Sequence, residues 1–112
     1  MTLKLEGSMT ALATPFKNGS LDEAAYQWLV DYQVDNGTSV LIPMGTTGES
    51  VTMTADERAQ AIAACIRFNK GRVKVFAGAG SNSTAETIAN VKKARELGAD
   101  GALIVTPYYN KP

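Results

Sequence analysis

Histidine is absent from the 112 residues, and cysteine occurs once, at Cys65. These absences exclude Ser-His-Asp and Cys-His catalysis, a histidine or cysteine metal site and an intrachain disulfide from this chain. Its chemistry must therefore use hydroxyls, carboxylates or lysines. Cys65 lies beside Ile62 and Ile66 in a helical pattern, which indicates a packed core thiol.

An excess of one charge and a long apolar run are also missing. Eleven basic and eleven acidic residues give a formal net charge of zero, which indicates neither a nucleic-acid partner nor a membrane partner. No apolar stretch approaches the roughly 20 residues of a membrane span, and residues 1–6 lack the layout of a signal peptide. We expect one globular, cytoplasmic unit over residues 1–112.

Strand and helix signals alternate along the chain. We expect strands over residues 8–14, 40–44, 74–77 and 102–106. Three capping boxes predict the helix starts: Ser20 with Glu23, Thr54 with Glu57, and Ser83 with Glu86. The apolar members of the first strand are Met9, Leu12 and Ala13. The apolar residues at helical spacing, which form one face of each helix, are Leu21, Ala25, Trp28, Leu29 and Tyr32, then Ala59, Ile62, Ala63 and Ile66, then Ile88, Val91, Ala94 and Leu97.

The order βαβαβαβ predicts an α/β fold with parallel strands joined by crossover helices. An open doubly wound sheet and part of a (β/α)8 barrel both fit this order. Gly78-Ala-Gly80 lacks the third glycine and the acidic partner of a dinucleotide loop, and no Walker loop is present, so we expect no nucleotide cofactor. A closed barrel needs roughly 250 residues, and four parallel strands alone leave two unpaired edges. We therefore expect the chain as given to be incomplete.

The turn after the second expected strand is a candidate ligand site. Val40–Met44 ends at Gly45, and Thr46, Thr47 and Gly48 follow. The glycines let a ligand approach the main chain, and each threonine hydroxyl both donates and accepts hydrogen bonds. Such a turn can hold a small carboxylate without a cationic side chain. The alternative is an ordinary strand-to-helix connection whose threonines satisfy the local backbone.

Four stretches, in order along the chain, are similar to motifs of the dihydrodipicolinate synthase / N-acetylneuraminate lyase family of class I aldolases. They are Ala13-Thr-Pro-Phe16, Gly45-Thr-Thr-Gly-Glu-Ser50, Ala77-Gly-Ala-Gly80 before Asn82, and Val105-Thr-Pro-Tyr-Tyr-Asn-Lys-Pro112. The doubled threonine and doubled tyrosine resemble the synthase branch more than the sialic-acid lyase branch. N-acetylneuraminate lyase or another 2-keto acid aldolase of the family remains an alternative. The resemblance implies the N-terminal half of a (β/α)8 TIM barrel, its first four strands and three helices, with the active site at the C-terminal ends of the strands.

The resemblance also implies a reaction. In the family, pyruvate forms a Schiff base with a lysine and condenses with aspartate semialdehyde, in lysine and diaminopimelate biosynthesis, within a homodimer or homotetramer. Thr46 and Thr47 match the residues that hold the pyruvate carboxylate, and Thr47 also matches the hydroxyl that links two tyrosines in a proton relay. Tyr109 matches the relay tyrosine that crosses the dimer interface. Because tyrosine has a pKa of about 10, such a relay needs a chain of hydrogen-bonded hydroxyls.

The family's Schiff-base lysine and one relay tyrosine have no counterpart in this sequence. None of the lysines at positions 70, 74, 92, 93 and 111 matches the nucleophile. Without a desolvated amine there is no imine chemistry, so we expect no turnover by this polypeptide alone. A packed aromatic pair is the alternative for Tyr108 and Tyr109. For the whole chain, the alternatives are a non-catalytic remnant that binds a carboxylate or dimerises, and a flavodoxin-like binding module.

One further resemblance concerns regulation by lysine. Members of the family's allosteric lysine site are matched by Ser50, Gly80, Asn82, Glu86 and Tyr108. Histidines of lysine-sensitive members are replaced here by Ala55 and Arg58. A cation at position 58 would repel the lysine ammonium, although pairing of Glu86 with Arg58 would offset part of that repulsion. We therefore expect insensitivity to lysine.

Overall fold

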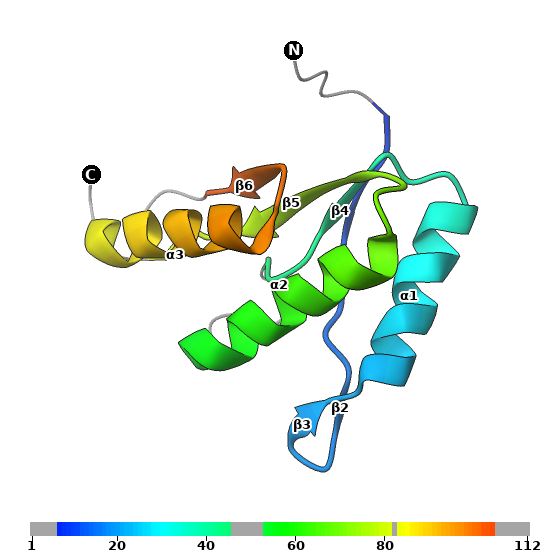
Figure 1. Ribbon diagram of the computed structural model, residues 1–112, viewed down its shortest axis with the longest axis horizontal. Helices are drawn as coiled ribbons and strands as arrows, with labels where there is room; N and C mark the ends of the chain where they lie inside the picture. Colours follow the sequence, from blue (N-terminus) through cyan, green and yellow to red (C-terminus); the bar gives the residue numbers. More distant parts are fainter. Residues whose placement is uncertain (1–6, 46–52, 82, 105–112) are drawn as a thin grey trace.

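A computed structural model describes residues 7–45, 53–81 and 83–104. Its elements in chain order are β1 (Met9–Ala11), β2 (Phe16–Lys17), β3 (Ser20–Leu21), α1 (Glu23–Asp35), β4 (Val40–Ile42), α2 (Ala55–Asn69), β5 (Lys74–Gly78), α3 (Thr84–Leu97) and β6 (Gly101–Leu103). The strands β1, β4, β5 and β6 form one parallel sheet in that order (Figure 1), which confirms the predicted alternation. Among the described residues, no helix is long and apolar enough to cross a membrane.

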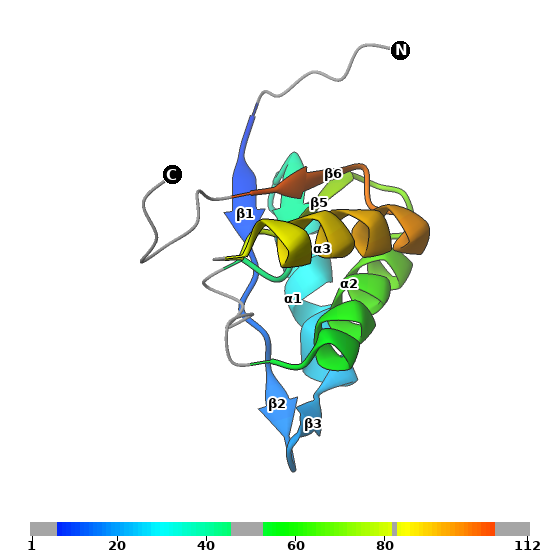
Figure 2. The same ribbon diagram turned by 90° about the vertical axis from the view of Figure 1, so that its left-hand side faces the viewer.

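The sheet order follows the chain order without reversal. Because βαβ crossovers are almost always right-handed, an order without reversal places every crossover helix on the same face of the sheet. Two views show α1, α2 and α3 along one side of the strands (Figures 1 and 2). Consecutive βα units of a (β/α)8 barrel have this topology, whereas the strand order of a doubly wound sheet reverses at its switch point.

The hydrophobic core lies between the sheet and the helices. Along β5, Val75 and Ala77 are buried against the helices, whereas Phe76 and Gly78 belong to the opposite face and are half-buried. Cys65 is fully buried, as predicted. The core residues, in chain order, are Leu12, Tyr26, Val30, Leu41, Met44, Met53, Ala61, Ile62, Ala64, Cys65, Val75, Ala77 and Ala94.

The predicted start of the first helix is wrong. Asn18 and Gly19 have φ angles of 54° and 79° and form the two-residue turn of a β2–β3 hairpin, a conformation that Asn-Gly favours. Ser20 therefore belongs to β3. The cap of α1 is Asp22, whose carboxylate accepts a hydrogen bond from the Ala25 N–H at 3.1 Å.

The predicted inward face of α1 is only partly right: Leu21 and Leu29 pack against the core, but Trp28 and Tyr32 do not. Tyr26 and Val30 are buried, whereas Trp28 is 62% exposed and Tyr32 is 49% exposed. The two exposed rings stack with their centroids 5.2 Å apart. Because α1 carries apolar residues on more than one side, helical spacing alone did not select the side that α2 covers. In α3, Ala94 is buried as predicted, but Ile88 is 52% exposed.

The first strand is shorter than predicted. Regular pairing with β4 covers only Met9 to Ala11. Leu12 is buried, but Met9 is 43% exposed and Ala13 is exposed. Alternation explains this pattern, since Leu12 and Thr14 share the side of the chain that meets the core, and Met9 and Ala13 lie on the other.

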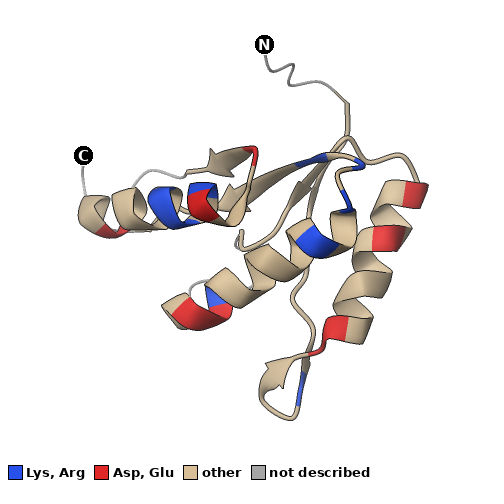
Figure 3. Cartoon of the chain, in the orientation of Figure 1, with Lys and Arg blue, Asp and Glu red and all other residues tan. Residues whose placement is uncertain are grey.

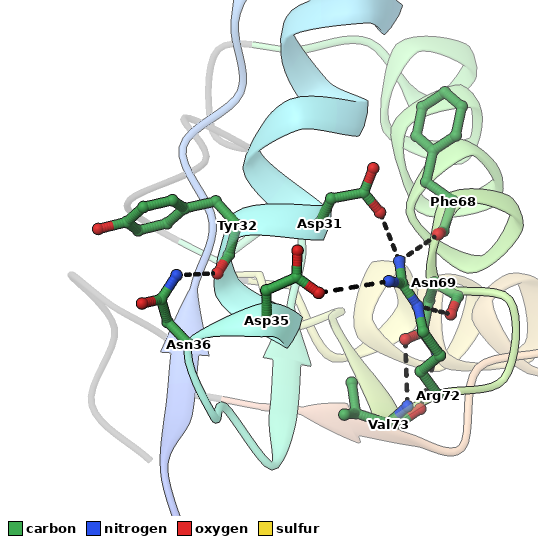
Figure 4. A network of polar contacts seen from close by, with 8 residues as sticks. All are labelled: Asp31, Tyr32, Asp35, Asn36, Phe68, Asn69, Arg72 and Val73. Atoms are coloured by element: carbon green, nitrogen blue, oxygen red, sulfur yellow. Dashed lines mark hydrogen bonds and ion pairs between the residues drawn. The ribbon is translucent and has the colours of Figure 1, made fainter.

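Polar contacts join α1 to the end of α2. Acidic residues lie along α1, and basic residues lie at the facing end of α2 and just after it (Figure 3). Arg72 pairs with Asp31 and donates to the carbonyls of Phe68 and Asn69 at 3.0 Å each (Figure 4). These carbonyls belong to the last turn of α2, where helical partners run out. Arg72 therefore caps α2 and fastens it to α1.

Candidate functional site

The residues that follow β4 turn sharply. Pro43 and Met44 are buried, and Met44 has a φ angle of 62°, in the left-handed region that few residues other than glycine adopt. The N–H of Gly78 donates to the Pro43 carbonyl at 2.7 Å. A β-carbon on Gly78 would lie 2.0 Å from the Met44 carbonyl oxygen, so this close approach requires glycine.

The carboxyl ends of the four parallel strands β1, β4, β5 and β6 lie together on the same side of the sheet as this turn, called the C-terminal edge below. The Leu12 N–H donates to the Ile42 carbonyl at 3.0 Å, and the Ala79 N–H donates to the Leu103 carbonyl at 3.0 Å. A β-carbon on Gly45 would lie 3.9 Å from the Leu103 side chain. Gly45, which precedes Thr46 in the sequence, is thus at the C-terminal edge, where parallel α/β folds place their ligand sites.

A network of hydroxyls shapes the connection from β5 to α3. The Ser81 N–H donates to the Thr87 hydroxyl at 3.0 Å, and the Asn90 side chain donates to the Ala79 carbonyl at 3.1 Å. Ser83 caps α3 as predicted, but the reciprocal half of the capping box is wrong. The Ser83 N–H donates to the Ser81 hydroxyl at 3.0 Å, and the Glu86 carboxylate lies 3.5 Å from that same hydroxyl.

Two of the predicted site residues are described. Gly80 is half-buried in the connection from β5 to α3, and Glu86 is exposed in the first turn of α3. The others lie outside the described residues, and their roles remain predictions: Thr46, Thr47, Ser50, Asn82, Tyr108 and Tyr109.

The pair of Glu86 with Arg58, which would offset part of the repulsion, does not form among the described residues. The Arg58 guanidinium donates to the Met53 carbonyl at 3.1 Å, and no ion pair joins it to Glu86 within residues 7–45, 53–81 and 83–104. The backbone carbonyl is nearer in sequence and holds the guanidinium against the start of α2. Arg58 and Lys93 both line a cavity of about 210 Å³ between α2 and α3, where Asp56 is the acidic lining residue.

The described lysines and the groups with shifted pKa values include no buried amine. Each lysine in the described residues has an exposed side chain, at positions 17, 70, 74, 92 and 93. Burial raises the pKa of Cys65 to about 12 and also raises the pKa of Tyr26, both between α1 and α2. The backbone and hydroxyl of Thr54 hold the pKa of Glu57 below its usual value, because the carboxylate accepts the Thr54 N–H at 2.8 Å in the predicted capping box.

Sequence reasoning missed Met44 and Gly78 as shaping residues. In the sequence, Gly78 is only the residue that follows the strand expected over residues 74–77, and no sequence pattern predicts a positive φ angle at a methionine. The one available signal was the glycine itself, since a glycine at a strand end often marks a close backbone approach.

This topology defines a segment of a (β/α)8-barrel protein, a class in which ligand sites lie at the C-terminal ends of the strands. The sequence model of the Dihydrodipicolinate synthetase family matches residues 4–112, and the chain belongs to this family. The expected N-terminal half of a TIM barrel is thereby confirmed.

Named relatives agree with this assignment. The chain is 59% identical over 109 residues to a 4-hydroxy-tetrahydrodipicolinate synthase of Bradyrhizobium diazoefficiens, covering 97% of this chain and 37% of that protein. It resembles the dihydrodipicolinate synthase of Acinetobacter baumannii complexed with pyruvate (TM-score 0.93, 44% identity, 97% of this chain and 38% of that one). It also resembles the DHDPS of Cyanidioschyzon merolae with lysine bound (TM-score 0.89, 44% identity, 94% and 36%). The chain thus spans little more than a third of the length of these relatives.

Proposed function

We propose that this chain forms the N-terminal part of a 4-hydroxy-tetrahydrodipicolinate synthase, a lyase that condenses pyruvate with aspartate semialdehyde in diaminopimelate and lysine biosynthesis. The observation that carries the proposal is the 59% identity to a curated synthase over 109 residues. Residues 1–112 then constitute one partial domain, the first four barrel strands with three helices. The β2–β3 hairpin is an addition between the first barrel strand and α1.

In this proposal, the turn after β4 binds the carboxylate of pyruvate. Thr46 and Thr47 supply the hydroxyls, and glycines on either side let the main chain approach the ligand. Support comes from Gly45, which lies at the C-terminal edge of the sheet beside Gly78 and Leu103. Thr47 also relays a proton toward Tyr109, which reaches the active site of a second subunit, so the working form is a homodimer or homotetramer.

The catalytic amine is supplied from outside this sequence. Imine formation needs an unprotonated, desolvated lysine, and the lysines of the described segment are exposed. We therefore propose that the isolated 112-residue chain binds pyruvate weakly and does not catalyse the condensation.

The test is a hybrid synthase in which residues 4–112 replace the matching segment of the Bradyrhizobium diazoefficiens protein. We expect the hybrid to condense pyruvate with aspartate semialdehyde. Replacing Thr47→Val keeps the shape and removes the hydroxyl, and loss of such a contact typically lowers the rate by ~10²–10³-fold. Thr84→Val, at an exposed position in α3, is the matched control and should retain the activity of the hybrid. A Thr47→Val hybrid within a few-fold of the parent would exclude the relay.

A further inference from the structure

We propose that Gly78 and Met44 are positioning residues that fix how the chain leaves β4 and thereby set the affinity of the Thr46–Thr47 turn for pyruvate. This inference rests on the proposed function and adds two residues that contact no substrate in it. Met44 immediately precedes the turn, whereas Gly78 ends the neighbouring strand, 34 positions later in the sequence.

Met44 adopts an unfavourable backbone conformation. Its φ angle is 62°, and its side chain is 1% exposed. In this left-handed region, the β-carbon of any residue except glycine is crowded by the backbone. Such a conformation persists only where the surrounding structure holds it, and it is typical of functional sites. The buried side chain of Met44 is one such constraint, because rotating the backbone would withdraw it from the core.

Gly78 is the second constraint. Its N–H donates to the Pro43 carbonyl at 2.7 Å, which ties the end of β5 to the chain just before Met44. The space where a β-carbon would stand is filled by main-chain atoms: the Met44 carbonyl oxygen at 2.0 Å, the Met44 carbonyl carbon at 2.4 Å and the Gly45 nitrogen at 2.7 Å. No side-chain rotation can relieve a clash with these atoms. The Met44–Gly45 peptide therefore lies directly against the backbone of Gly78.

Through this contact, a substitution at Gly78 would displace the residues that lead into the Thr46–Thr47 turn. A β-carbon 2.0 Å from the Met44 oxygen must be separated from it to at least 3.0 Å, the closest approach that real β-carbons show. The residues flanking Gly78 cannot yield easily, since Ala77 and Ala79 are both buried. The Met44–Gly45 peptide must then move by ~1 Å, and a displacement of that size in a substrate-positioning group typically costs ~10²-fold in rate.

The experiment uses the hybrid synthase with Gly78→Ala. We expect kcat/KM for pyruvate to fall by ~10²-fold, mostly through a higher KM for pyruvate. The KM for aspartate semialdehyde should change little. The matched control is Gly71→Ala, which also replaces a glycine but has open space around its β-carbon and a φ angle of 70°. Gly71 lies just after α2 at the opposite end of the sheet, so this control should lower the melting temperature and keep the KM for pyruvate.

A second pair of variants keeps the inference testable if Gly78→Ala does not fold. Met44→Ala and Met44→Gly both remove the long side chain, but only glycine adopts the left-handed conformation without crowding. We expect Met44→Gly to melt at the higher temperature, and we expect it to raise the KM for pyruvate because the turn loses its fixed exit. Met44→Ala melting above Met44→Gly, or Gly78→Ala or Met44→Gly with the pyruvate KM of the parent, would overturn the inference. If the unsubstituted hybrid is inactive, the proposed function fails and the inference with it. If only Thr47→Val is impaired, the inference alone fails.

Discussion

The buried thiol of Cys65 should make this segment sensitive to alkaline pH. Cys65 is fully buried between α1 and α2, and burial raises its pKa from 9.0 to about 12. Its neighbour is the Tyr26 hydroxyl, on a side chain that is also fully buried. In the unfolded chain the thiol ionises near pH 9, whereas in the folded chain it stays protonated. Folding stability is therefore intact below pH 9 and is lost as pH rises toward 12.

The size of this loss follows from the pKa difference. Each pH unit between the two pKa values removes ~1.4 kcal/mol. We expect the free energy of unfolding to fall by ~1.4 kcal/mol at pH 10 relative to pH 8. Tyr26 adds to the loss above pH 10, since burial raises its pKa as well. The comparison is therefore clearest between pH 8 and pH 10.

The assay is urea unfolding of the hybrid synthase at pH 8, 9 and 10, beside the Cys65→Ala variant. The variant should be less stable at every pH, because it removes a packed side chain. Its free energy of unfolding should lack the part of the pH dependence that the thiol contributes. Parallel loss of stability in the parent and in Cys65→Ala would refute the reasoning.

Two further predictions concern cations. Replacing Arg72→Ala should lower the free energy of unfolding by ~2–3 kcal/mol, because two charged hydrogen bonds to the last turn of α2 are lost, while the partly exposed ion pairs add less than ~1 kcal/mol. The stability of Arg72→Lys should lie between those of the parent and Arg72→Ala. Equal melting temperatures for all three proteins would contradict the capping role. Lysine should not inhibit the hybrid at sub-millimolar concentration, because a like charge at ~4 Å from Arg58 costs ~4 kcal/mol at an effective dielectric near 20. A lysine titration tests this, and Arg58→Gln should increase the sensitivity.

Much of the fold was predictable because its signals are local. The capping box of Thr54 with Glu57 formed as expected, since both of its hydrogen bonds lie within four residues. The buried run Val40–Ile42 and the helix end at Asn36 also formed as predicted. Parallel pairing followed from the alternation of elements.

The incorrect predictions concern features that depend on tertiary contacts. Asn18-Gly19 is a hairpin signal that competes with the cap at Ser20, and the hairpin prevailed because Asp22 could cap the helix instead. Trp28 became exposed because α2 covers the side of α1 that carries Tyr26. The approach of Gly78 to Met44 joins neighbouring strands, so no pattern within one stretch could reveal it.

The central claim is that the turn after β4 binds pyruvate for a lysine that lies outside this segment. Borohydride reduction of the hybrid synthase with pyruvate, followed by peptide mass spectrometry, tests it most directly. The account predicts one reduced pyruvate adduct on a lysine outside residues 4–112, with Thr47→Val needing a much higher pyruvate concentration for the same yield. An adduct on a lysine within residues 4–112, or an unchanged pyruvate dependence in Thr47→Val, would contradict it.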